Sequence, residues 1–205
     1  MPLLLLIRHA ENDFVRTGRL AGRQPGVHLN ENGRMQAEAL GSRLSQFPLN
    51  AIYSSPLERT QETAAPLAQA LGLPVILRPG LIEVDCGKWQ GRTLKSLRRL
   101  KVWKVVQYTP CEFRFPEGES FPEVQARICQ EIDALCSQHG EKEVLACFSH
   151  ADPIRLALAY YLGMPLDAFQ RLVIAPTAVA VLNISEKGSK LLAINVDVSQ
   201  VMPHP

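Results

Sequence analysis

The sequence begins with a short apolar run, Leu3-Leu4-Leu5-Leu6-Ile7, which leads directly into Arg8-His9. Consecutive apolar residues bounded by polar ones are typical of a strand that is buried on both faces. Such strands occur in parallel sheets whose two faces are covered by helices. The run therefore predicts an α/β fold in which residues 3–7 form a central strand, with Arg8 and His9 at its carboxyl end.

The rest of the chain alternates further strands with helices. Predicted strands cover residues 50–54, 75–77, 144–148, 172–174, 178–184 and 191–196, with a turn at Lys187-Gly188 before the last one. Alternation of this kind favours a three-layer α/β/α sandwich with a mainly parallel central sheet.

Capping residues predict where the helices begin. Predicted helices start at Asn30, Ser55, Ser120 and Asp152, and another covers residues 93–108. Ser55 and Ser120 each have glutamate three positions later, the capping-box pattern, while Ser55 and Asp152 precede a proline at the first helical position. The helix after Asn30 should place Met35, Leu40 and Leu44 on its apolar side.

Length and composition indicate one globular domain. The 205 residues are 46% apolar and 20% charged, so we expect a single domain over residues 1–197 and a C-terminal tail over 198–205. The net charge of +2 gives no reason to expect a nucleic-acid or membrane partner. The apolar run at residues 3–7 is too short for a transmembrane segment or a signal peptide, which predicts a cytoplasmic protein.

The cysteines predict neither a disulfide framework nor a metal site. They are odd in number and never occur as a Cys-x-x-Cys pair, so we expect reduced, structural thiols and no metal or cofactor. The five are Cys86, Cys111, Cys129, Cys136 and Cys147.

Chemically active residues follow four of the predicted strands. Arg8-His9 ends the first strand, Arg59 lies in the first turn of the helix after the second, Glu83 follows the third, and His150 follows the fourth. Ligands of an open α/β sheet bind beyond the carboxyl ends of its strands. We therefore expect these five side chains to converge at one edge.

This set suits displacement at phosphorus with histidine as the nucleophile. Paired arginines offer permanently charged, bidentate donors that neutralise a phosphate monoester, so no metal is required. A carboxylic acid whose pKa is raised by the neighbouring phosphate could protonate the leaving oxygen and later activate water. Glu83 is the acid placed for that role.

The segment Leu6-Ile7-Arg8-His9-Ala10-Glu11 resembles the Arg-His-Gly signature of the histidine phosphatase superfamily, which includes cofactor-dependent phosphoglycerate mutase. The resemblance extends through residues 29–37, 53–64, 83–91, 118–120 and 149–150, and covers residues 3 to about 184. It implies that His9 becomes phosphorylated, that Arg8, Arg59 and His150 hold the phosphoryl group, and that Glu83 donates and accepts the proton. The substrate-binding residues that it implies are Arg8, Asn12, Gly22, Arg59, His150 and Ala151.

Several positions depart from the pattern of that superfamily. Ala10 replaces the usual glycine, Asn12 stands where serine or threonine is common, and Val15 occupies the place of a phosphate-contacting asparagine. Ala151-Asp152 replaces Gly-Gly after His150. These changes affect the shape of the phosphate pocket and therefore the substrate and rate more than the reaction class.

The function that these residues favour is a metal-independent phosphomonoesterase acting on a small phosphorylated metabolite. A phosphoglycerate mutase-type phosphomutase is the first alternative, although mutases of this family carry a longer insertion between the acid and the second histidine. The second alternative is a non-catalytic phosphate-binding protein, which would need neither a nucleophile nor an acid. A homodimer is left open. A dinucleotide-binding dehydrogenase is disfavoured because no Gly-x-Gly-x-x-Gly follows the first strand.

Residues 88–104 contain seven basic side chains and no acidic one. A solvated helix face explains such a stretch, and a basic lid over an anionic substrate is the functional interpretation. Arg16, Arg19 and Arg23, in the loop after His9, allow the same two interpretations.

Overall fold

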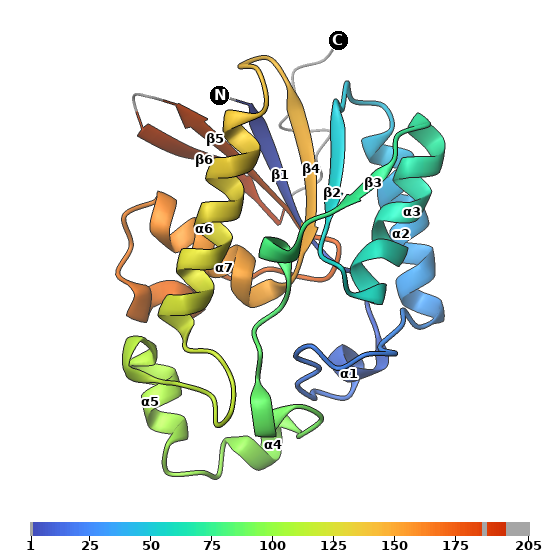
Figure 1. Ribbon diagram of the computed structural model, residues 1–205. Helices are drawn as coiled ribbons and strands as arrows, with labels where there is room; N and C mark the ends of the chain where they lie inside the picture. Colours follow the sequence, from blue (N-terminus) through green and yellow to red (C-terminus); the bar gives the residue numbers. More distant parts are fainter. Residues whose placement is uncertain (1, 186–187, 196–205) are drawn as a thin grey trace.

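A six-stranded, mostly parallel sheet forms the centre of the protein (Figure 1). The computed structural model describes residues 2–185 and 188–195. The strands lie in the order β3-β2-β4-β1-β5-β6. Their bounds are Leu3–Arg8 for β1, Ala51–Ser54 for β2, Val75–Leu77 for β3, Val144–Ser149 for β4, Val179–Ser185 for β5 and Gly188–Ile194 for β6. Strands β1 to β4 run parallel to one another, and β5 pairs antiparallel with both β1 and β6.

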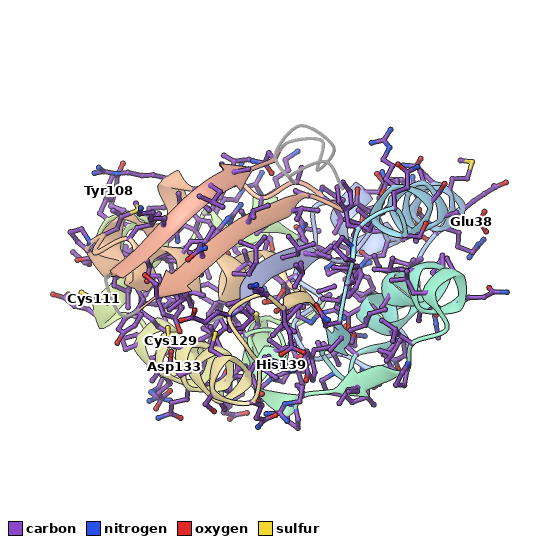
Figure 2. The ribbon with its side chains drawn as sticks, turned by 90° about the horizontal axis from the view of Figure 1, so that it is seen from above. Glu38, Tyr108, Cys111, Cys129, Asp133 and His139 are labelled. Atoms are coloured by element: carbon purple, nitrogen blue, oxygen red, sulfur yellow. The ribbon has the colours of Figure 1, made fainter. Side chains whose placement is uncertain are left out.

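Two pairs of helices cover the two faces of the sheet. Alternate residues of β1 point to opposite sides, so that Leu4 packs in one apolar cluster and Leu5 in the other. Helices α6 (Phe121–Ser137) and α7 (Ala151–Tyr161) contribute to the first cluster, and α2 (Glu31–Leu44) and α3 (Glu58–Leu71) to the second. In Figure 2, Cys129 and Asp133 mark α6 on one side, and Glu38 marks α2 on the other. The predicted three-layer sandwich is confirmed.

Residues 82–120 form a cap beyond the carboxyl ends of the parallel strands, where Figure 1 shows α4, α5 and α1. The short helices of this end are α1 (Asp13–Arg16), α4 (Leu94–Leu97) and α5 (Trp103–Tyr108). Four 3-10 helices cover Pro79–Leu81, Gly87–Trp89, Pro110–Glu112 and Leu166–Arg171. An aromatic cluster that includes Trp89, Phe113, Phe115 and Phe121 packs the cap against α6 and α7.

Two of the predicted helix starts are confirmed. Asn30 caps α2, with its side chain accepting a hydrogen bond from the Gly33 amide. Ser120 and Glu123 form the reciprocal capping box at the start of α6. Strands were also predicted correctly within one residue for β1 to β5.

Two other caps and one core residue were predicted wrongly. Helix α3 begins at Glu58 with Leu57 as its cap, and α7 begins directly after His150, so neither Ser55 nor Asp152 is a cap. The side chain of Ser55 instead contacts His150, and that of Asp152 pairs with Arg155. Met35 is 62% exposed, because a helix that buries Leu40 and Leu44 turns position 35 towards solvent.

The predicted helix over residues 93–108 is broken into α4 and α5, with turns at 98–102. Leu97, Leu100, Trp103 and Val106 all pack in the same cluster, at steps of three residues. A straight α-helix of 3.6 residues per turn would rotate that series away from one face. The break keeps all four in the cluster.

The predicted strand at 172–174 is absent from the described part of the chain. Its backbone carbonyls bind side chains instead of a neighbouring strand: Ile174 accepts from Arg8, and Val173 accepts from Asn195. The last strand ends at Ile194, and Lys187, Val196 and the tail at 198–205 lie outside the described residues. No helix within the described ranges is long and apolar enough to cross a membrane.

Candidate active site

The sheet brings two histidines together. Strands β1 and β4 are parallel neighbours, with Arg8 opposite Ser149, so His9 and His150 follow at the same level. The His9 amide donates to the Ser149 carbonyl at 3.0 Å, and the two imidazole rings meet edge to face with centroids 5.2 Å apart. Both rings are buried.

The hydrogen bond that His9 makes to its own neighbour selects its tautomer. Its Nδ1 lies 2.7 Å from the Ala10 carbonyl, which only accepts, so Nδ1 carries the hydrogen and Nε2 keeps a lone pair. Burial, together with the positive charges of Arg59 and Arg8, lowers the pKa of His9 well below its usual value. The ring is therefore neutral near pH 7, with Nε2 available as a nucleophile.

Arg8 and Arg59 present unsatisfied donors beside His9. Arg8 Nη1 donates to the Ile174 carbonyl at 2.7 Å, and Arg59 Nη2 donates to the Gly22 carbonyl at 2.8 Å. Arg8 Nε and Arg59 Nε and Nη1 are buried without a partner in the described part of the structure. Neither arginine forms an ion pair with a carboxylate among the described residues. Buried cations with free N–H groups are suited to binding a phosphate.

Asn12 adds a neutral donor to this group. Its Oδ1 accepts from the Val15 amide at the start of α1, while its buried Nδ2 has no partner within the described residues. Val15 and Ala151 contribute apolar surface to the same pocket. The sequence-predicted set of Arg8, Asn12, Gly22, Arg59 and Ala151 thus lines one pocket with His9 and Glu83, while His150 lies behind His9.

Glu83 enters the pocket from the cap. Its Oε1 accepts from the Val84 amide at 2.9 Å, and its Oε2 lies 3.8 Å from Nδ1 of His150. Burial and the negative charge of Asp152 raise the pKa of Glu83 to about 7. A carboxyl group with that pKa is protonated in much of the population near neutral pH and can act as a general acid.

The pocket has a volume of about 510 Å³ and extends from these residues outward beneath the cap. Its outer wall is largely aromatic, with Trp89, Trp103, Phe115 and Phe121, and Arg19 and Arg98 lie on it as well. Of the basic side chains at 88–104, Arg98 lines the pocket, whereas Lys88 pairs with Glu117 at the surface. Lys88 therefore behaves as part of a solvated surface, whereas Arg98 is in a position to contact an anionic substrate.

Sequence reasoning missed two polar groups of the site. Ser55, interpreted as a helix cap, lies with its Oγ 2.8 Å from Nε2 of His150. Asp152, the other supposed cap, pairs with Arg155 at 3.0 Å and faces the pocket. Their positions directly after β2 and β4 were a signal for the site, because pocket residues of such sheets follow the strand ends.

Comparison with known proteins points to one family. The family model described as "Histidine phosphatase superfamily (branch 1)" matches residues 4–197. Phosphoserine phosphatase 1 of Hydrogenobacter thermophilus is 32% identical over 96% of this chain and 93% of its own length. A probable phosphoglycerate mutase of Erwinia tasmaniensis is 32% identical over 84% of this chain and 80% of its own.

A solved structure agrees in sequence and fold. A phosphoserine phosphatase variant from Entamoeba histolytica, in complex with phosphoserine, superposes with a TM-score of 0.87 and 26% identity. The match covers 96% of this chain and 98% of that one. With a family match over nearly its whole length, a sheet of the same kind and both histidines at its edge, the chain belongs to the histidine phosphatase superfamily, branch 1.

Proposed function

We propose that the chain is a phosphatase that cleaves the monoester of a small phosphorylated metabolite through a phosphohistidine on His9. The observation that carries the proposal is the environment of His9: a neutral ring with a free Nε2, beside two arginines that each keep at least one buried N–H group without a partner in the described structure. Family membership and the phosphatase-named relatives support hydrolysis as the activity.

In the first step, the Nε2 lone pair of His9 forms a bond to phosphorus while the ester P–O bond breaks. The leaving oxygen takes the proton of Glu83, so an alcohol departs rather than an alkoxide. Arg8 and Arg59 bind the phosphoryl oxygens, and their fixed charges stabilise the negative charge of the transition state. The Asn12 amide adds a hydrogen bond to the same group.

In the second step, Glu83 is a carboxylate and accepts a proton from water. The water oxygen bonds to phosphorus, the P–N bond breaks, and inorganic phosphate leaves with His9 neutral and Glu83 protonated again. We assign His150 to the phosphoryl group through its Nδ1, which has no hydrogen-bond partner in the described structure and lies 3.8 Å from Oε2 of Glu83, while Ser55 binds its Nε2.

The substrate screen should begin with phosphoserine, because relatives of similar length carry that name. The pocket is also lined by aromatic groups beyond the phosphate site, so aryl and larger alkyl phosphates belong in the same screen. The mutase alternative is supported by the Erwinia relative. Turnover of 3-phosphoglycerate with and without added 2,3-bisphosphoglycerate separates the two, since a mutase needs the bisphosphate and releases little phosphate.

The nucleophile is tested by trapping the phosphoenzyme. Wild-type protein mixed with labelled substrate and quenched rapidly should carry acid-labile, base-stable phosphate, and His9→Ala should lose both the label and turnover, on the order of 10⁶-fold. His28→Ala is the control, because His28 is exposed and lies outside the pocket. Labelling that persists in His9→Ala would contradict the assignment and shift it to His150.

A further inference from the structure

The acid Glu83 lies on a stretch of chain without regular structure. Residues 82–86 connect the 3-10 helices Pro79–Leu81 and Gly87–Trp89, so no helix or sheet ladder fixes their backbone. A misplacement of about 1 Å can cost roughly 10²-fold in rate. Other groups must therefore hold Glu83 where it can reach the leaving oxygen.

The guanidinium of Arg127, in α6, binds backbone carbonyls of this stretch and of the residues just before it. Its Nη1 donates to the Gly80 carbonyl at 2.8 Å and to the Ile82 carbonyl at 2.9 Å. Its Nη2 lies 3.4 Å from the carbonyl of Glu83 itself. One guanidinium thus donates to three carbonyls of the stretch that leads to Glu83, and those of Gly80 and Ile82 have no other partner among the described residues.

Arg23, in the loop after α1, binds the same carbonyl. Its Nε donates to the Glu83 carbonyl at 2.9 Å. Arg23 directly follows Gly22, whose carbonyl accepts from Arg59. The loop that holds a phosphate-binding arginine therefore also holds the backbone of the acid.

Glu119 joins the two arginines. Its Oε1 accepts from Arg23 Nη2 at 2.7 Å and from Arg127 Nε at 3.2 Å. Its Oε2 accepts from Arg127 Nη2 at 3.1 Å and from the Asp85 amide at 3.0 Å. Although burial opposes it, the hydrogen bonds from Arg127 and Asp85 lower the pKa of Glu119, which therefore stays anionic. We call Arg23, Glu119 and Arg127 the carbonyl clamp.

We propose that the carbonyl clamp positions Glu83 for proton transfer, with Arg127 as its principal member. None of the three clamp residues lines the pocket, so they act through the Glu83 backbone and not on the substrate. The inference rests on the proposed function, because it assigns positioning residues to the acid of that reaction.

The test compares leaving groups in the phosphorylation step. Arg127→Gln should slow rapid-quench phosphorylation by an alkyl phosphate chosen in the screen by about 10- to 100-fold. Phosphorylation by p-nitrophenyl phosphate, whose leaving group departs without protonation, should slow by less than about threefold. The pH at which the alkyl phosphate rate falls should also move, because the surroundings of the carboxyl group change.

Arg78→Gln is the matched control. Arg78 forms a comparable ion pair with Glu131 of the same helix but makes no contact to Glu83. It should leave the ratio of the two rates unchanged. A role of Arg127 in folding alone would lower both rates equally through a smaller active fraction, and that result would overturn the proposal.

A second variant covers the case in which Arg127→Gln does not fold. Arg23→Gln removes the 2.9 Å bond to the Glu83 carbonyl from a partly exposed loop residue, and it should give the same selective loss, smaller in size. Equal rates in Arg23→Gln and wild type for both esters would count against the clamp.

Glu83→Gln separates this inference from the proposed function. If Glu83→Gln shows no preference for the good leaving group, the assignment of the acid fails. If it does show that preference and the clamp variants do not, only the positioning role fails. In the Glu83→Gln background, Arg127→Gln should add little further loss, because the group that it positions is gone.

Discussion

The two halves of the candidate active site are built in different ways. His9 and His150 stand at the ends of β1 and β4, whose parallel register sets their separation through a ladder of backbone hydrogen bonds. Glu83 comes from the irregular start of the cap, and side chains from two distant segments, Arg23 and Arg127, hold its backbone carbonyl. We call these the strand half and the cap half.

The two halves differ in the kind of group that fixes them: backbone hydrogen bonds in the strand half and charged side chains in the cap half. A ladder hydrogen bond depends little on side-chain identity, so the strand half is held by backbone groups that nearly every residue carries. Ala10 can replace glycine there because its backbone groups bind Thr63 and His9. The cap half depends on a few charged side chains, and its position is sensitive to single substitutions.

The largest effect should come from removing the proposed acid of the cap half while leaving the strand half intact. Glu83→Gln should lower turnover of alkyl phosphates by roughly 10²- to 10⁴-fold, the usual contribution of general acid catalysis. Phosphorylation of His9 by p-nitrophenyl phosphate should fall much less. Rapid-quench labelling measures this step separately, since slower water attack would let phosphoenzyme accumulate. Equal losses for both esters would reject Glu83 as the acid.

The pH dependence of kcat/KM should show the titration of Glu83, the acid of the cap half, near neutral pH. With the pKa of Glu83 raised to about 7 by burial and Asp152, kcat/KM for alkyl phosphates should fall about tenfold per pH unit above that value. His9 should limit activity only well below pH 6.5, because burial lowers its pKa. A profile of kcat/KM from pH 4 to 9 checks both limbs, and a flat alkaline limb would contradict the Glu83 assignment.

Stability should change over the same range. The folded state binds the Glu83 proton more tightly than the unfolded chain does, so this stabilisation is complete below pH 4.5 and is lost as pH rises through about 7. Glu83→Gln should therefore show a smaller fall in Tm between pH 5 and pH 8 than wild type. An identical fall in both proteins would argue against the raised pKa.

A smaller effect should come from Ser55 in the strand half. Ser55→Ala removes the 2.8 Å bond to His150 and should lower kcat/KM by roughly tenfold, corresponding to a hydrogen bond of about 1.4 kcal/mol. A helix cap would instead cost about 1 kcal/mol of stability with no change in kinetics. Measuring kcat/KM and the free energy of unfolding together distinguishes the two roles. Asn30→Ala, which removes a genuine cap, is the control.

The smallest effect should come from the rim of the cap half. Arg98 lines the pocket and its neighbour Arg99 does not. Arg98→Gln should raise KM for substrates with more than one negative charge by a few-fold at low salt, an effect that 0.5 M salt should remove. Arg99→Gln should change KM less. Equal shifts in both variants would indicate a diffuse charge effect rather than a contact in the pocket.

Local sequence determined most of the sheet and of the strand half. A short, continuous apolar run such as Leu3 to Ile7 is typical of a strand that is buried on both faces of a sheet. The residues directly after the run then lie at the end of that strand. His9, Arg8 and His150 were therefore predictable from position alone. The capping boxes were less certain signals, because Ser120 caps a helix and Ser55, in the same pattern, binds a histidine.

The tertiary structure alone decided the cap half. Glu83 was proposed as the acid from the sequence, but Arg23 and Arg127, which bind its backbone carbonyl, come from separate segments whose meeting no local pattern specifies. The break between α4 and α5 likewise follows from packing in a shared aromatic cluster. Local propensity and periodicity act within a few residues, whereas buried charge pairs and apolar clusters form across the chain, so only the folded chain fixes where the acid stands.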